Sequence, residues 1–167
     1  MKRAVVGLAL SGALWSCTSP APTPQVTSTC SASDAGPMNG LPTASLGRQV
    51  DGPFQPLLDG DTMPVVYGPQ GGEHVYVSVR LFTQVRGTWV YSFQALDESG
   101  SQVGSSTQVV SACGPGWTTS TYVRVLFAFA APSKGILVLS ARPQGTAPDL
   151  DAGAGPLDQR VHVTFKP

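Results

Sequence analysis

Apolar and polar residues alternate along most of the C-terminal two-thirds of the chain, which is the pattern of half-buried β-strands. The clearest run, 74–82, places Val75, Val77, Val79 and Leu81 on one face and polar residues on the other. No stretch sustains the spacing of an amphipathic helix. Turns rich in Gly, Pro and Asp separate the alternating runs. The pattern therefore predicts an all-β fold.

The same reasoning predicts strands at 54–58, 63–67, 74–82, 89–96, 102–110, 122–130, 136–141 and 160–165. Their inward positions include Trp89 and Phe129, whereas His74 and His162 are expected on solvated outward faces. Several short strands at this spacing are typical of two layers packed face to face. We predict an antiparallel two-sheet β-sandwich of about seven or eight strands over residues 46–167.

The N-terminus reads as a secretion signal. A basic start is followed by an apolar run over 4–14, which is too short to span a membrane, and the run ends in Leu14-Trp15-Ser16-Cys17. This ending resembles the lipobox of bacterial lipoproteins, in which a Cys becomes the lipid-carrying first residue after cleavage. The resemblance implies a signal peptide at 1–16 and lipid attachment at Cys17. An ordinary signal peptide cleaved elsewhere is the alternative.

The lipoprotein resemblance also implies a location. The partner is then the membrane, reached through the lipid anchor, and the protein belongs to the bacterial cell envelope. Thr18 follows the Cys, where an Asp would favour retention in the inner membrane, so the outer membrane is expected. Several dozen buried methylenes, at about 0.8 kcal/mol each, would make such anchoring effectively permanent.

Residues 17–45 differ in composition from the rest of the chain. From Thr18 to Ser45 there are five Pro and ten Ser or Thr, with Asp34 as the single charged residue. Such a segment buries too little apolar surface to offset the entropy of ordering. We expect a disordered tether that carries the acylated Cys and holds the domain off the bilayer.

The cysteine count is three, and the lipobox accounts for the odd one. Cys30 and Cys113 remain, and two thiols in an oxidising envelope tend to pair. Their disulfide would fasten the end of the tether to the loop at 111–117 and stabilise the fold by about 4 kcal/mol in the entropic description. Two free thiols are the alternative.

Composition and charge narrow the classes of function. Only 12% of the 167 residues are Asp, Glu, Lys or Arg, and the formal net charge is zero, which argues against a basic nucleic-acid binder. The chain has two His and 10 acidic residues, and it holds no nucleophile elbow, zinc-protease helix or Walker loop. Binding is therefore favoured over catalysis.

Two segments resemble known proteins. The run Trp89-Val90-Tyr91-Ser92-Phe93-Gln94-Ala95-Leu96-Asp97-Glu98-Ser99-Gly100 resembles the third strand and following turn of immunoglobulin-like domains, where an inward Trp centres the core. The resemblance implies an immunoglobulin-like sandwich. The segment Val65-Val66-Tyr67-Gly68-Pro69-Gln70-Gly71-Gly72-Glu73-His74-Val75 is similar to one in uncharacterised envelope lipoproteins, and that likeness implies no activity.

One group of outward residues stands out as a candidate binding patch. If the strands at 74–82 and 122–130 are neighbours, Tyr76, Arg80, Tyr122 and Arg124 share an outward face. Tyr and Arg are favoured at interfaces because they combine contact area with hydrogen bonding. The alternative is a solvated face with stacked side chains and no partner.

A calcium site is the one cofactor that the sequence suggests. Asp149 and Asp151 alternate and are followed by Gly, which resembles the start of calcium-binding loops, and the next carboxylate is Asp158. A polar hairpin loop is the alternative. No other cofactor is expected.

These observations predict a non-enzymatic, lipid-anchored envelope protein that serves binding, adhesion or assembly with an envelope protein or a glycan. The alternatives are a small glycan-acting hydrolase or accessory enzyme, which would have to draw its carboxylates largely from Asp, or a calcium-stabilised binding domain.

Overall fold

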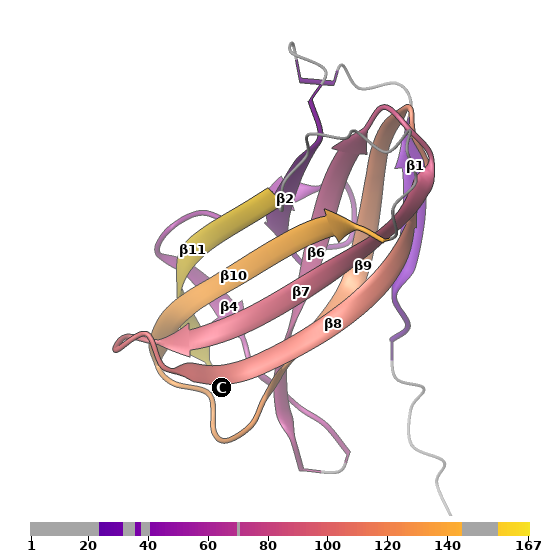
Figure 1. Ribbon diagram of the computed structural model, residues 1–167. Helices are drawn as coiled ribbons and strands as arrows, with labels where there is room; N and C mark the ends of the chain where they lie inside the picture. Colours follow the sequence, from indigo (N-terminus) through magenta and orange to yellow (C-terminus); the bar gives the residue numbers. More distant parts are fainter. Residues whose placement is uncertain (1–23, 32–35, 38–40, 70, 145–156) are drawn as a thin grey trace, which may run out of the picture.

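The computed structural model describes residues 24–31, 36–37, 41–69, 71–144 and 157–167. Within these ranges the chain forms eleven β-strands and no helix, so the all-β prediction is confirmed (Figure 1). No helix that could cross a membrane is therefore found in these ranges. The strands lie in two layers, which we name sheet I and sheet II, and the predicted sandwich is confirmed.

Sheet I centres on two long neighbouring strands, β6 (Glu73–Thr83) and β9 (Gly116–Phe127). β2 (Thr43–Arg48) pairs with the other edge of β6 and carries the short β3 (Gln55–Pro56). The two-residue β5 (Val66–Tyr67) pairs with the start of β6, and β1 (Thr27–Ser31) pairs with β9.

Sheet II is a run of neighbouring strands in the order β8, β7, β10, β11 and β4. Their bounds are β8 Gln102–Ala112, β7 Gly87–Asp97, β10 Lys134–Pro143, β11 Leu157–Lys166 and β4 Asp61–Pro64. All described ladders of both sheets are antiparallel except the one between β11 and β4, which is parallel.

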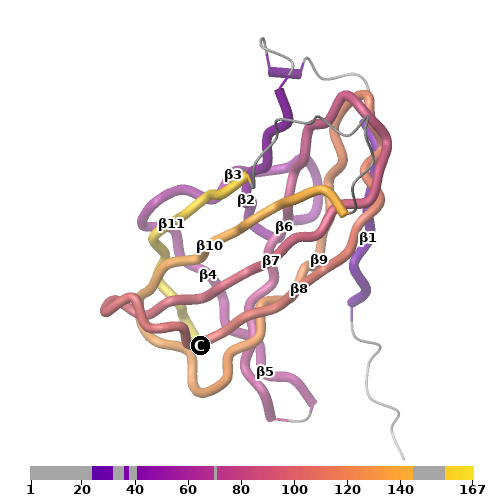
Figure 2. Tube along the Cα trace, viewed as in Figure 1, coloured from indigo at the N-terminus to yellow at the C-terminus, as the bar shows by residue number. Residues whose placement is uncertain are grey.

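The two sheets are joined by a short ladder between β8 and β9. Only Gly104 and Ser105 of β8 pair with β9, opposite Phe127 and Leu126. A side chain at Gly104 would collide with the backbone carbonyl of Leu126, so the close approach requires glycine. Beyond this junction the strands diverge, and the continuous ladder bends over into two layers (Figure 2).

The core lies between the sheets and holds the predicted inward residues. β7 buries Trp89, Tyr91, Phe93 and Ala95, so the expectation of an inward Trp in this strand is confirmed. The rings of Phe127 and Phe165 meet across the layers at 5.1 Å. Other buried residues that alternation predicted are Val75, Val77, Val79, Leu81, Val123, Val125, Val161 and Val163.

Strands begin earlier in the chain than expected. Residues 27–31, expected in a disordered tether, form β1, and β2 begins at Thr43 rather than beyond residue 45. β1 is a run of Thr, Ser and Cys, and its backbone pairs with β9 from Trp117 to Thr121. Backbone hydrogen bonds and a covalent link therefore order a segment that buries little apolar surface. The proposed signal peptide and Cys17 lie outside the described residues.

The predicted disulfide is present. Cys30 of β1 is bonded to Cys113, which lies between β8 and β9, and the two Cα atoms are 5.7 Å apart. The bond fastens β1 at the end where β8 turns into β9.

Two strand assignments are wrong in detail. β9 ends at Phe127, so Phe129, expected inward, is 81% exposed. The strand expected at 63–67 is divided into β4 and β5, which belong to different sheets. Val65 lies between them and donates its amide hydrogen to the carbonyl of Lys166 at 2.8 Å.

Candidate functional site

The predicted neighbours β6 and β9 are adjacent, and they bring the candidate patch together. Tyr76 lies directly opposite Arg124 in the ladder, and Arg80 lies opposite Thr119. The rings of Tyr76 and Tyr122 meet edge to face at 5.9 Å. We name the outer face formed by Tyr76, Arg80, Tyr122 and Arg124 the Tyr/Arg surface.

Tyr122 is held in an unusual backbone conformation. Its φ is +56°, a region that a bulky L-residue adopts only at a cost of about 1–2 kcal/mol. The cause is a bulge, because the register shifts between Val77 and Val79 and leaves an additional residue in β9. A strained residue persists only where the surrounding structure holds it in place, and such residues are common at functional sites.

The segment after β2 supports this conformation. The Tyr122 amide donates a hydrogen bond to the side-chain oxygen of Gln49, and the phenol donates to Asp51 at 3.3 Å. The nearby carboxylate of Asp51 raises the pKa of Tyr122. One of these bonds therefore holds the backbone of Tyr122 and the other restrains its ring, which reduces the entropy lost on binding.

Arg80 lies between two aromatic rings at the other end of the surface. Its guanidinium carbon is 4.3 Å from the Trp117 ring centre and 5.8 Å from that of Phe54. Stacking of this kind orients the guanidinium on the outer face.

A groove of about 440 Å³ lies between β1, β9 and the segment at 49–54. We name it the outer groove. Its lining combines hydroxyl, amide and carboxylate groups with two aromatic rings and a guanidinium: Thr29, Ser31, Gln49, Asp51, Phe54, Arg80, Thr119, Thr121 and Tyr122. The Tyr/Arg surface therefore borders a recess that can bind a polar ligand.

His74 is not the solvated residue that parity predicted. It is buried, with 4% of its surface exposed, because β5 pairs alongside it and the Tyr76 ring lies 4.8 Å away. Burial lowers the pKa of His74, and the positive charge of Arg124 lowers it further. The lowered pKa favours the neutral imidazole at pH 7, beside Tyr76 at one end of the Tyr/Arg surface.

The other titratable residues do not assemble into a metal site in the described ranges. His162 is exposed on β11 of sheet II, whereas His74 belongs to sheet I. No group of three or more His, Cys, Asp or Glu suited to a metal ion occurs in the described part. Asp149 and Asp151 of the possible calcium loop lie outside it, and Asp158 is exposed on β11.

Most described carboxylates have local structural partners. Asp61 pairs with Arg48 at 3.1 Å, and Asp59 accepts the amide of His162 at 2.7 Å. Glu73 accepts the amide of Ala131 at 2.6 Å. Asp97 accepts the Ser99 hydroxyl at 2.6 Å and the amides of Ser101 and Ser99, each at 2.9 Å, in the turn after β7, and these bonds lower the pKa of its carboxyl.

Comparisons with known proteins find only distant structural likeness. No protein-family model matches the chain, and no curated protein matches it. A glycosyl hydrolase family 2 member from Bacteroides cellulosilyticus is 12% identical with a TM-score of 0.44, and the match covers 73% of this chain but 14% of that one.

Two smaller solved structures are also similar. The N-terminal domain of PorA has a TM-score of 0.36 at 14% identity and covers 74% of this chain, with 98% of its own length matched. The CooA pilin subunit from enterotoxigenic Escherichia coli has a TM-score of 0.31 at 11% identity, with 74% and 97% covered. All three TM-scores are too low to indicate a function for this chain.

Sequence reasoning found four members of the site and missed the others. Alternation could not place Gln49 and Asp51 beside β9, because both contact Tyr122, about 70 positions away. Phe54 was missed because its contact with Arg80 depends on the path of the segment after β2. Trp117 was missed because it lies on the N-terminal extension of β9, before the predicted strand. No Gly or turn residue next to Tyr122 in the sequence indicates the bulge.

Proposed function

We propose that this protein is a non-enzymatic binding module of the bacterial envelope, anchored by lipid at Cys17. The Tyr/Arg surface and the outer groove beside it form the binding site. The partner is an envelope protein or a glycan, with polar groups for Arg80 and Arg124 and a face that packs on Tyr76 and Tyr122.

The positive φ of Tyr122 is the observation that carries the proposal. A glycine would adopt this backbone conformation at lower cost, so a tyrosine kept there and held by Gln49 and Asp51 supports a role for its side chain. A rigid aromatic side chain beside two arginines is what a binding surface requires.

The structural roles of the carboxylates support binding rather than hydrolysis. A glycosidase needs two carboxyl groups facing a shared cleft. Asp59, Asp61, Glu73 and Asp97 instead form hydrogen bonds or an ion pair with neighbouring backbone or side chains.

The test compares two pairs of arginines. Native envelopes are crosslinked with the wild-type protein or with an Arg80→Ala/Arg124→Ala variant, and the captured partners are identified by mass spectrometry. An Arg142→Ala/Arg160→Ala variant is the matched control, because both of these arginines are exposed on sheet II. We expect the first pair to lose partners that the second retains. Equal capture by all three proteins would overturn the proposed site.

The anchor is tested separately by labelling cells with palmitate. Wild-type protein should take up the label, whereas Cys17→Ala should not. Equal labelling would contradict lipidation at Cys17 and leave the binding site to be judged on its own experiment.

A further inference from the structure

The sandwich is open on the side where β1 and β8 lie (Figure 1). β8 pairs with β7 along its length, but its other edge pairs with β9 only at Gly104 and Ser105. From Ser106 to Ala112, no strand in the described ranges pairs with this edge. β1 pairs with β9 alone among the described strands. One unpaired edge from each sheet therefore borders this side.

Two neighbouring hollows lie between the two edges. One, of about 470 Å³, lies at the Ser106 end, and the other, of about 610 Å³, lies at the Ala112 end. Val26 and Gln108 line both hollows, so the two lie next to each other. We name the two hollows together the edge groove.

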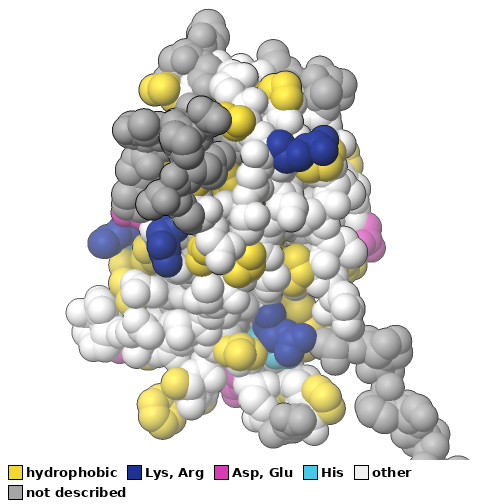
Figure 3. All heavy atoms as spheres, turned by 45° about the vertical axis from the view of Figure 1, so that its right-hand side comes forward, with side chains coloured by type: hydrophobic (Ala, Val, Ile, Leu, Met, Phe, Trp, Pro, Cys, Tyr) yellow, Lys and Arg dark blue, Asp and Glu magenta, His cyan; other side chains and the backbone are white. Residues whose placement is uncertain are grey.

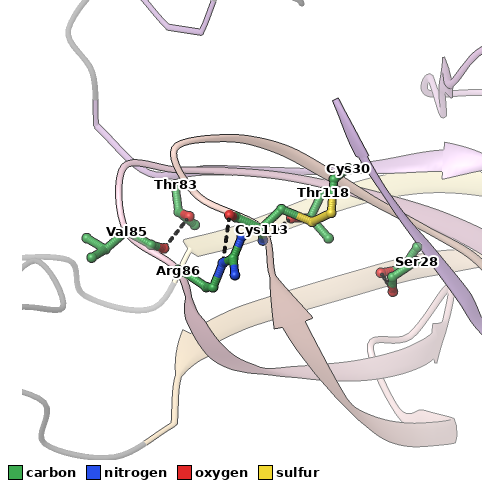
Figure 4. The surroundings of a disulfide bond; sticks show 8 residues. Ser28, Cys30, Thr83, Val85, Arg86, Cys113 and Thr118 are labelled. Carbon is green, nitrogen blue, oxygen red and sulfur yellow. Dashed lines mark hydrogen bonds between the residues drawn. A yellow bond between two sulfur atoms is a disulfide. The ribbon is translucent and has the colours of Figure 1, made fainter. Parts of the chain in front are cut away.

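The edge groove has an arginine at each end and no Asp or Glu in the lining of either hollow. Arg86 lies at the Cys113 end, where its Nε donates to the Cys113 carbonyl at 3.4 Å (Figure 4). Arg124 lies at the Ser106 end, where its backbone carbonyl accepts a hydrogen bond from the Ser106 hydroxyl. Figure 3 shows basic atoms near the top and near the bottom of this side, with polar and hydrophobic surface between them.

The length of the open edge sets the size of a ligand. Residues 106–112 of an extended strand span about 20 Å, which sets an upper limit of six or seven residues for another strand, because the Cys30–Cys113 bond brings β1 close to the Ala112 end. Val109, which is 50% exposed, offers an apolar contact midway along this edge. Such a ligand would present alternate side chains to the space between the sheets and to solvent.

We propose that the edge groove binds an extended peptide that adds as a strand to β8 and carries acidic side chains near both ends. Main-chain groups of Ser106–Ala112 supply hydrogen bonds, and Arg86 and Arg124 pair with the acids. A polysaccharide does not present backbone N–H and C=O groups at the spacing of a strand, so a peptide is favoured. The inference extends the proposed binding role to a second ligand site, which shares Tyr122 and Arg124 with the Tyr/Arg surface.

The test uses a seven-residue peptide of alternating Val and Thr with Asp at each end. Its binding to the full chain is followed by calorimetry, next to a peptide with Lys at each end and an Asp-ended peptide N-methylated at alternate amides. We expect measurable binding of the first alone. Equal binding of the N-methylated peptide, or of a soluble uronate polymer, would overturn strand addition, and no binding of any peptide would overturn the site.

A variant at Arg86 tests the edge groove alone, because Arg86 is exposed and lies outside the Tyr/Arg surface. Arg86→Gln should weaken the Asp-ended peptide about tenfold, whereas Arg142→Gln on sheet II should leave it unchanged. In Arg86→Glu, a peptide with Lys at the matching end should regain the lost affinity. Failure of that rescue would contradict charge pairing at this end.

The two proposals fail in different ways. Arg80 lines the outer groove and not the edge groove, so Arg80→Ala should reduce envelope capture while leaving peptide affinity unchanged. If no peptide binds but the Arg80→Ala/Arg124→Ala variant still loses its envelope partners, strand addition alone is wrong.

Discussion

The outer faces of the two sheets differ although both arise from the same alternating pattern. Outward positions of sheet II hold residues such as Gln94, Ser140 and Arg142, which suit a solvated surface. The outer face of sheet I holds Tyr76, Arg80 and Trp117, which contact other aromatic rings. Burial in the core between the sheets does not explain large aromatic residues on an outward face. The contrast supports the proposed placement of the Tyr/Arg surface on sheet I.

The disulfide should produce the largest change, because it fastens β1 to the end of sheet I. Replacing both Cys30 and Cys113 by Ser should lower the free energy of unfolding by about 4 kcal/mol, since the unfolded chain regains the entropy of a long loop. Urea unfolding measures the loss. Wild-type protein under reducing conditions is the control and should be as unstable as the variant; if it kept its full stability, the cross-link would not be the cause.

Trp89 and Trp117 allow one residue type to be compared between the sheets. Trp89→Ala should cost about 4 kcal/mol, because Trp89 is 2% exposed in the core. Trp117→Ala should cost about 2 kcal/mol, because its ring is half-buried against Arg80 and Phe82. Thermal or urea unfolding gives both values. Equal losses would mean that Trp117 belongs to the core and not to the surface.

Tyr122 tests the strained bulge. At an ordinary strand position Ala stabilises more than Gly, but at a positive φ the order reverses. Tyr122→Gly should therefore be more stable than Tyr122→Ala by about 1 kcal/mol, while both lose the envelope partner. The same pair of substitutions at Tyr76, where the backbone is extended, is the control and should show the usual order.

His74 should give the smallest effect, visible as a dependence on pH. The folded-state pKa lies below the ordinary value of 6.5, so the unfolded chain binds more protons below that pH. The free energy of unfolding should therefore fall as the pH is lowered from 6.5 toward the folded-state pKa of His74. Below that pKa, His74 should cause no further fall. A His74→Gln variant should lack this part of the slope. Identical profiles for the two proteins would contradict a buried neutral His74.

The predictable part of the molecule is the part set by period-two alternation. That pattern placed Val75, Trp89 and Val163 in the core, because a strand buries every second residue whatever its neighbours are. The pattern failed for His74, because a residue on the outer face is exposed only where no other segment covers it. β5 pairs beside His74 and covers it. The pattern also failed for β1, whose order comes from a disulfide and a ladder to distant residues.

The site was predictable to a similar extent. Parity placed Tyr76 and Arg124 on one face, and a correct guess of neighbouring strands brought them together. The bulge that turns Tyr122 and the segment that fixes it depend on contacts between residues far apart in the chain, which alternation does not encode.

Photo-crosslinking in the native envelope tests the central claim most directly. A photoreactive amino acid replaces Tyr122 on sheet I in one protein and Gln94, which is exposed on sheet II, in another. The proposed binding site predicts a discrete crosslinked partner from position 122 and none, or only scattered products, from position 94. The same partner captured equally from both positions, or from position 94 alone, would contradict the assignment of the binding surface to sheet I.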